Sequence, residues 1–145
     1  MKKEVYVEMF LMEKEFYPNI LNSGGLGPCV AIGIYNPNER SGYMIHHPMP
    51  YKDNLNSFFK VIKKDYKNTS NLKIYVTGNS PSETDDLTQD EHYSLRTLVE
   101  ESIENNFESS KLRYDWTDDL NCITSLILDL EKEKFSVERE YLERY

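Results

Sequence analysis

Two residue types that can perform nucleophilic catalysis lie close together in the first third of the sequence. Cys29 directly follows a glycine-rich run, Ser23–Pro28, and His46 lies seventeen positions after the cysteine, with His47 next to it. A cysteine becomes a strong nucleophile only when a neighbouring base or cation stabilises its thiolate. The pattern therefore indicates thiol chemistry if the fold brings an imidazole to Cys29.

The residues between the cysteine and the histidines predict a β-hairpin that would do this. A polar turn (Asn-Pro-Asn-Glu-Arg-Ser, 36–41) separates two strand-like runs. If Tyr35 pairs with Gly42, the alternation of side chains places Cys29 and His46 diagonally on one face. Diagonal neighbours lie roughly 7–8 Å apart at the backbone, within reach of a long side chain. The other face would carry the larger side chains: Val30, Ile32, Ile34, Tyr43, Ile45, His47 and Met49.

A different hairpin register would exchange the two histidines. Shifting the turn by one residue puts His47 on the face of Cys29. The same shift splits the apolar side chains between both faces, which register selection disfavours. We therefore expect His46 to be the partner of Cys29.

These residues also resemble those of a known family, the CheD chemotaxis receptor glutamine deamidases. The run Ser-Gly-Gly-Leu-Gly-Pro-Cys-Val-Ala-Ile from Ser23, followed by Gly-Tyr-Met-Ile-His ending at His46, is similar to the family's Thr-Leu-Gly-Leu-Gly-Ser-Cys-Val-Ala-Val and Gly-(Gly/Ala)-Met-x-His. Asn36-Pro37 stands where the family has a short turn. The resemblance implies that Cys29 is the nucleophile, His46 its base, and Ser23 the hydroxyl residue that orients the imidazole.

The chain departs from the family pattern beside the nucleophile. Pro28 replaces a serine and so removes one backbone N–H. An oxyanion donor must then come from Cys29 itself or from the glycines before it, chiefly Gly25 and Gly27. The glycine-rich sequence that family members often carry before their last strands is missing here.

The resemblance implies an activity and partners. The expected reaction is cysteine-dependent hydrolysis of glutamine side-chain amides to glutamate and ammonia, on methyl-accepting chemotaxis receptors, with a CheC-like phosphatase as a possible binding partner. No cofactor and no metal ion are implied. Two alternatives remain open: a catalytically weak or inactive module of the same fold that acts by docking, and a different cysteine hydrolase such as a small-amide amidase.

The length, charge and cysteine content of the whole chain limit the functions that these residues can serve. Its 145 residues suit one domain, 1–145, with a substantial core. A formal charge of −8 and a pI near 4.9 argue against nucleic acid as a partner. No signal peptide or membrane-spanning apolar run is visible, so we expect a cytoplasmic protein that is not inserted in a membrane. Two cysteines, Cys29 and Cys122, fit a reducing compartment.

The remaining sequence predicts strands and two helices. Strand periodicity covers Lys3–Phe10, whereas Leu11–Asn22 has no clean period and reads as a connecting loop. Further strands are expected at Leu72–Thr77, Lys111–Trp116, Cys122–Leu130 and Phe135–Arg139. One helix would follow Asp53 or Asn54 and bury an apolar stripe ending at Tyr66. Another would begin at a capping box formed by Thr88 and Glu91, after the acidic segment Glu83–Asp86.

Two helices among about seven strands predict the α+β class. The helices must cover an apolar sheet face, which gives a layered α/β/β sandwich with mixed sheets and both helices on one face. His92 lies among acids without a second ligand at metal spacing, so we expect a solvated residue. Cys122 lies within a strongly apolar run and is expected to be a small buried hydrophobe.

Overall fold

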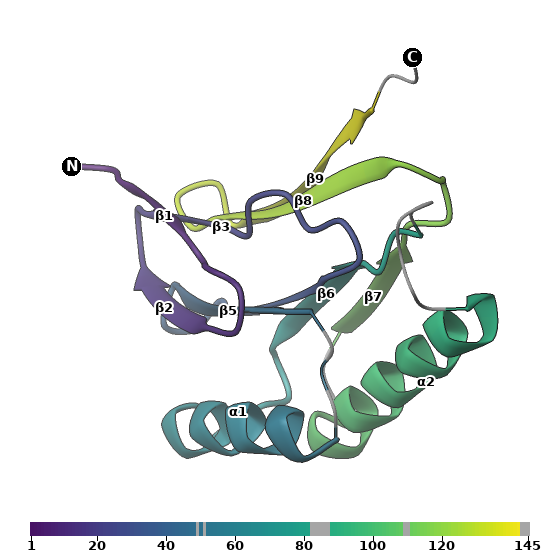
Figure 1. Ribbon diagram of the computed structural model, residues 1–145. Coiled ribbons are helices and arrows are strands. Elements are labelled where there is room, and N and C mark those ends of the chain that lie inside the picture. The colour runs from purple at the N-terminus through teal and green to yellow at the C-terminus, as the bar shows by residue number, and fades with distance from the viewer. Residues whose placement is uncertain (49, 51, 82–87, 109–110, 143–145) are drawn as a thin grey trace.

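The chain forms three stacked layers (Figure 1), and the computed structural model describes residues 1–48, 50, 52–81, 88–108 and 111–142. A four-stranded sheet, in the order β1-β3-β8-β9, packs on a five-stranded sheet, in the order β2-β5-β4-β6-β7. Two helices cover the outer face of the five-stranded sheet. This is the α+β sandwich with mixed sheets that the sequence predicts. The elements are β1 (Glu4–Tyr6), β2 (Met12–Phe16), β3 (Ile20–Asn22), β4 (Val30–Asn36), β5 (Ser41–His47), α1 (Lys52–Asp65), β6 (Lys73–Gly78), α2 (Gln89–Asn106), β7 (Lys111–Trp116), β8 (Cys122–Asp129) and β9 (Lys134–Tyr141).

The β4–β5 hairpin has the predicted register. Tyr35 pairs with Gly42 and Ala31 pairs with His46. Because side chains alternate, the two faces of this hairpin belong to two different cores. The larger apolar side chains pack under the helices, and the face that begins at Cys29 packs against β8 of the other sheet. Met49 and the acidic segment 83–86 lie outside the described residues.

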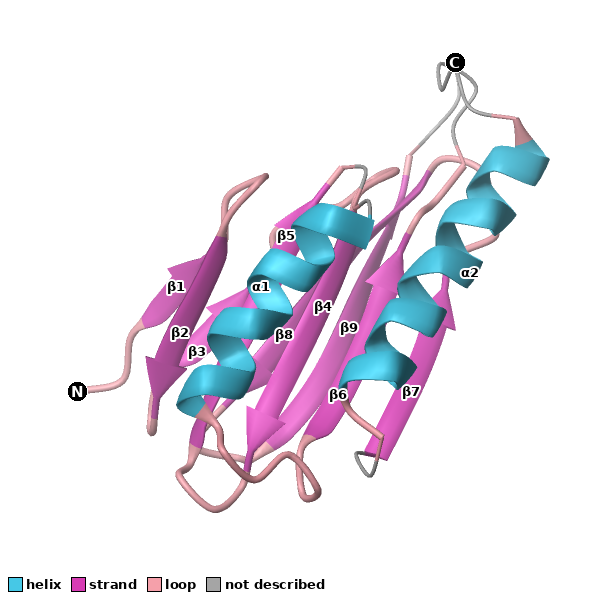
Figure 2. Cartoon of the chain, turned by 90° about the horizontal axis from the view of Figure 1, so that it is seen from below, coloured by secondary structure: helices cyan, strands magenta, loops and turns pink. Residues whose placement is uncertain are grey.

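Both helices form with the predicted apolar spacing, but α1 begins at Lys52, so the caps expected at Asp53 or Asn54 lie inside its first turn. On α1, Leu55, Phe59 and Ile62 recur at helical spacing and are fully buried. On α2, the Thr88 side chain accepts from the N–H of Glu91, and the Glu91 carboxylate accepts from the N–H of Thr88, which completes the predicted capping box. Figure 2 shows both helices lying over the five-stranded sheet and running roughly along its strands.

The segment 11–22 differs from the prediction of a loop, because it contains β2 and β3. Every residue from Met12 to Glu15 is partly buried, so no alternation of buried and exposed positions marks β2 in the sequence. This strand is the edge of the five-stranded sheet and pairs only with β5. The first strand is also shorter than predicted, since pairing covers only Glu4–Tyr6. Edge strands are specified by their neighbour, which a local pattern does not contain.

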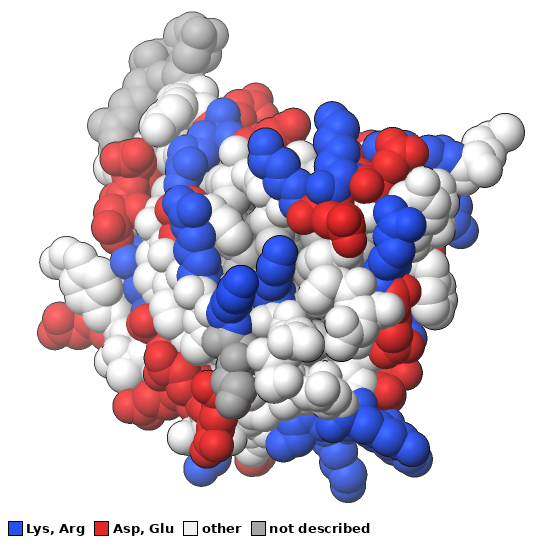
Figure 3. Space-filling view, turned by 180° about the vertical axis from the view of Figure 1, so that it is seen from behind, with Lys and Arg blue, Asp and Glu red and all other residues white. Residues whose placement is uncertain are grey.

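The exposed faces of the helices carry opposite charge. Seen from behind, basic side chains gather over α1 and acidic side chains over α2 (Figure 3). Lys60, Lys63 and Lys64 on α1 are exposed, as are Glu101 and Glu104 on α2. Both faces are exposed to solvent, as is usual for charged helix faces. Within the described part of the chain, no helix is both long and apolar enough to cross a membrane.

Candidate functional site

One end of the sandwich brings together the loops that hold the candidate residues. The loop after β1 reaches the end of β5, where the N–H of Phe10 donates to the carbonyl oxygen of His46 at 2.7 Å. The loop before β4 meets the end of β6, where the N–H of Asn79 donates to the carbonyl oxygen of Cys29 at 2.8 Å. Backbone hydrogen bonds therefore fix both candidate catalytic residues from two sides.

Cys29 lies directly before β4 and faces the core between the two sheets. The residue is 3% exposed and belongs to the apolar cluster that includes Leu26, Ala31 and Leu126. Its N–H donates to the carbonyl oxygen of Leu26 at 2.8 Å. Burial raises the pKa of the Cys29 thiol above its ordinary value because it removes solvent from the thiolate. In this conformation the sulfur is a neutral thiol at neutral pH.

His46 lies on the same face of the neighbouring strand, directly opposite Ala31. Its Nδ1 is 2.9 Å from the carbonyl oxygen of Val7, so Nδ1 carries the proton and donates it. With Nδ1 as the donor, the neutral form of the ring has its lone pair at Nε2. Nε2 is buried and has no hydrogen-bond partner among the described residues, and so no bond yet joins it to the Cys29 sulfur.

The role expected for Ser23 is filled by another group. The Ser23 hydroxyl donates to the carbonyl oxygen of Gly24 at 2.8 Å and accepts from the N–H of Leu126 at 2.9 Å. It ties the glycine-rich loop to β8 and makes no bond to His46. The tautomer of the imidazole is set by Val7, through a backbone carbonyl that residue types in the sequence do not reveal.

Two glycines before Cys29 have N–H groups without a protein acceptor in the described part of the chain. The N–H of Gly24 donates to Asn22 Oδ1, that of Leu26 donates to Thr124, and that of Cys29 is also engaged. In contrast, the N–H groups of Gly25 and Gly27 donate to no acceptor within the described ranges. Gly25 is exposed and Gly27 partly exposed, so both can meet a ligand. These are the two glycines that the sequence selects as oxyanion donors.

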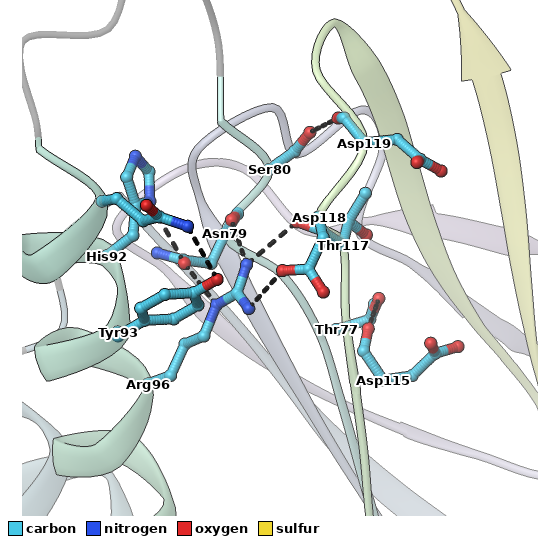
Figure 4. A network of polar contacts seen from close by, with 11 residues as sticks. Thr77, Asn79, Ser80, His92, Tyr93, Arg96, Asp115, Thr117, Asp118 and Asp119 are labelled. Carbon is cyan, nitrogen blue, oxygen red and sulfur yellow. Dashed lines mark hydrogen bonds and ion pairs between the residues drawn. The ribbon is translucent and has the colours of Figure 1, made fainter.

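A second polar cluster, drawn in Figure 4, joins α2 to the loops after β6 and β7, and the sequence does not predict it. His92 is 4% exposed, which corrects the expectation of a solvated residue, and its Nδ1 lies 3.1 Å from Asn79 Oδ1. Arg96, one turn further along α2, is 7% exposed and donates through Nε to the same oxygen at 2.7 Å. The signal available in the sequence was the i, i+4 spacing of these two side chains on the buried face of α2.

Cys122, the second cysteine, lies in the core and not at an open site. Cys122 is fully buried, as expected. Its carbonyl oxygen accepts from the Ser80 hydroxyl at 2.5 Å. Across the described ranges, no group of three histidine, cysteine or acidic side chains is placed to hold a metal ion.

No protein-family model and no curated protein matches this chain.

Proposed function

We propose that the chain is a thiol amidohydrolase of the CheD type that converts glutamine side chains of a protein substrate to glutamate. Cys29 is the nucleophile and His46 the general base. The observation that carries the proposal is the unpartnered Nε2 of His46, which lies on the same strand face as the thiol with its tautomer already set by Val7. Leaving a buried nitrogen without a partner costs about 1–3 kcal/mol, and a proton from Cys29 would end that cost.

The reaction follows from these positions. As substrate binds, the Cys29 sulfur turns toward His46, which takes the thiol proton at Nε2, and the thiolate attacks the carboxamide carbon. The N–H groups of Gly25 and Gly27 stabilise the oxyanion, a contribution of roughly 3–4 kcal/mol per donor in hydrolases. His46 returns the proton to the leaving nitrogen, and ammonia departs. Water, deprotonated by His46, then splits the thioester and restores the thiol.

The substrate and partners are proposed from the sequence resemblance. Glutamines on methyl-accepting chemotaxis receptors are the proposed substrate, and a CheC-like phosphatase is the proposed partner. A net charge of −8 supports a protein substrate rather than a nucleic acid. We place the reaction in the cytoplasm.

One observation favours a second candidate, a docking module of the same fold. The Cys29 thiol is almost completely buried and its pKa is raised, which is the state of a structural cysteine. Catalysis then depends on the substrate to bring sulfur and imidazole together, because hydrogen bonds of catalytic groups often form only in the substrate complex. A docking module would bind the same protein and leave its glutamines intact.

Ammonia release separates the two candidates. Purified protein is incubated with glutamine-bearing receptor peptides, and ammonia and the mass increase of the peptide are followed together. We expect release that disappears in Cys29→Ala and falls about 10²–10⁴-fold in His46→Ala, with Cys122→Ala as the matched control that keeps the activity. Binding of the peptides without any ammonia from the wild-type protein would favour the docking module.

A further inference from the structure

The loop Gly27–Cys29, which ends at the proposed nucleophile, is hydrogen-bonded to a three-residue turn, Gly78–Ser80, at the end of β6. The N–H of Asn79 donates to the carbonyl oxygen of Cys29 at 2.8 Å, and the N–H of Ser80 donates to that of Gly27 at 3.0 Å. The two bonds fix the peptide units on both sides of the Pro28–Cys29 step. Gly78 permits this approach, since a Cβ there would lie 2.2 Å from the oxygen of Cys29.

Asn79 holds an unusual backbone conformation at this turn. Its φ is +55°, in the left-handed region, and the residue is completely buried. The Asn79 side chain does not bond its own turn. Its Oδ1 instead accepts from Arg96 Nε at 2.7 Å, while its carbonyl oxygen accepts from Arg96 Nη2 at 3.1 Å. One guanidinium therefore holds both the side chain and the backbone of Asn79, as Figure 4 shows.

Arg96 makes two more hydrogen bonds through its terminal nitrogens. Nη2 donates to the carbonyl oxygen of Thr117 at 3.0 Å, and Nη1 lies 2.6 Å from Asp118 Oδ1. The rings of Tyr93 and Trp116 lie 5.2 and 5.6 Å from the guanidinium carbon. Burying a charge is favourable only when it is paired and hydrogen-bonded, and this guanidinium meets both conditions. The planar guanidinium presents its N–H donors in fixed directions and so fixes the positions of its acceptors, whereas a lysine ammonium does not.

We propose that Arg96 and Asn79 are positioning residues for the Cys29 nucleophile. The guanidinium fixes Asn79 in its left-handed conformation, and the N–H groups of Asn79 and Ser80 then fix the carbonyls of Cys29 and Gly27. The thiol is thereby kept on the face of His46, and Gly25 and Gly27 keep their N–H groups free of protein acceptors. The inference rests on the proposed function, but the connection from α2 to the cysteine loop stands on the hydrogen bonds alone.

The test uses two variants and one control. Asn79→Gly keeps a residue that adopts positive φ and keeps the N–H donor, but removes the acceptor of Arg96 Nε. Arg96→Lys keeps the charge and loses the fork. Tyr66→Phe is the control, because it breaks another buried hydrogen bond, 2.6 Å between Tyr66 Oη and Ser41 Oγ. Ser41 is the first residue of β5, at the opposite end of that strand from His46. Unfolding in urea ranks the three variants by stability.

Two readouts distinguish positioning from general destabilisation. With glutamine peptides, we expect kcat of Asn79→Gly and Arg96→Lys to fall about 10–100-fold with KM nearly unchanged, because small misplacements of reacting groups have effects of this size. Tyr66→Phe should keep the wild-type kcat. Equal kcat in Asn79→Gly and Tyr66→Phe would overturn the proposal.

Alkylation by iodoacetamide, with both cysteines resolved by mass spectrometry, gives the second readout. Releasing the loop should expose the thiol and speed labelling of Cys29 by about fivefold or more over the Tyr66→Phe control, with Cys122 unchanged. If the wild-type protein releases no ammonia, the proposed function fails, and this labelling ratio alone decides the positioning claim. The positioning claim would be contradicted if Cys29 were labelled at the same rate in the variants and in the Tyr66→Phe control, or if labelling of Cys122 accelerated equally.

Discussion

A methyl group added at Gly78 should damage the site far more than one added at Gly27, although both glycines have positive φ. At Gly78, φ is +110°, and the new Cβ would lie 2.2 Å from the carbonyl oxygen of Cys29 and 3.1 Å from Leu26 Cδ1. A carbon needs about 3.3 Å from such an oxygen, so the two backbones must separate by about 1 Å. The strained backbone costs about 1–3 kcal/mol and the overpacking about as much again. We therefore expect Gly78→Ala to lose about 2–6 kcal/mol of unfolding free energy.

Gly27→Ala is the matched control for this prediction. Its φ is +53°, but no atom lies within 4 Å of the position of the new Cβ. Only the left-handed backbone is penalised, and we expect a loss of about 1–2 kcal/mol. Urea unfolding at pH 7, followed by the fluorescence of Trp116, the single tryptophan of the chain, measures both variants. Equal losses would refute the close contact between Gly78 and the carbonyl oxygen of Cys29.

Two further predictions concern hydrogen bonds around the cores. Ser23→Ala should lower the unfolding free energy by about 1–3 kcal/mol, because it leaves the N–H of Leu126 without its acceptor. Because Val7 sets the tautomer of His46, ammonia release by Ser23→Ala should fall much less than by His46→Ala, and an equal fall would return the orienting role to Ser23. Asp65 accepts from Lys14 Nζ at 2.5 Å and Tyr43 Oη at 2.6 Å, and these bonds, that of Lys14 first, lower the pKa of its carboxyl group. A lowered pKa stabilises the fold above the ordinary pKa of the carboxyl group and is lost as pH falls through the lower value. Urea titrations should therefore show the difference between wild type and Asp65→Asn shrinking below about pH 4, whereas a constant difference would contradict the assignment.

The sequence predicts the hairpin well because its determinants are local. Turn residues 36–41 and the alternation of apolar side chains on both strands agree on one register, which the structure has. The capping box at Thr88 is equally local and is also present. This register is sufficient to place Cys29 and His46 on one face of the hairpin.

Other features depend on partners distant in the chain and were not predictable. The strand Met12–Phe16 exists through its pairing with β5, and its residues are neither clearly buried nor clearly exposed. The imidazole of His46 is oriented by a backbone carbonyl, which any residue type at position 7 would supply. Arg96 is buried because the loops after β6 and β7 offer two carbonyls and an amide oxygen, so a residue that usually faces solvent lies inside.

Trapping of the nucleophile by a substrate analogue tests the central claim most directly. The probe is a glutamine peptide whose side-chain carboxamide is replaced by a chloromethyl ketone, from which a thiolate displaces chloride. Mass spectrometry after proteolysis locates the adduct. We expect one adduct, at Cys29 and not at Cys122, formed much more slowly in His46→Ala. Absence of an adduct at Cys29, or the same rate with and without the imidazole, would contradict it.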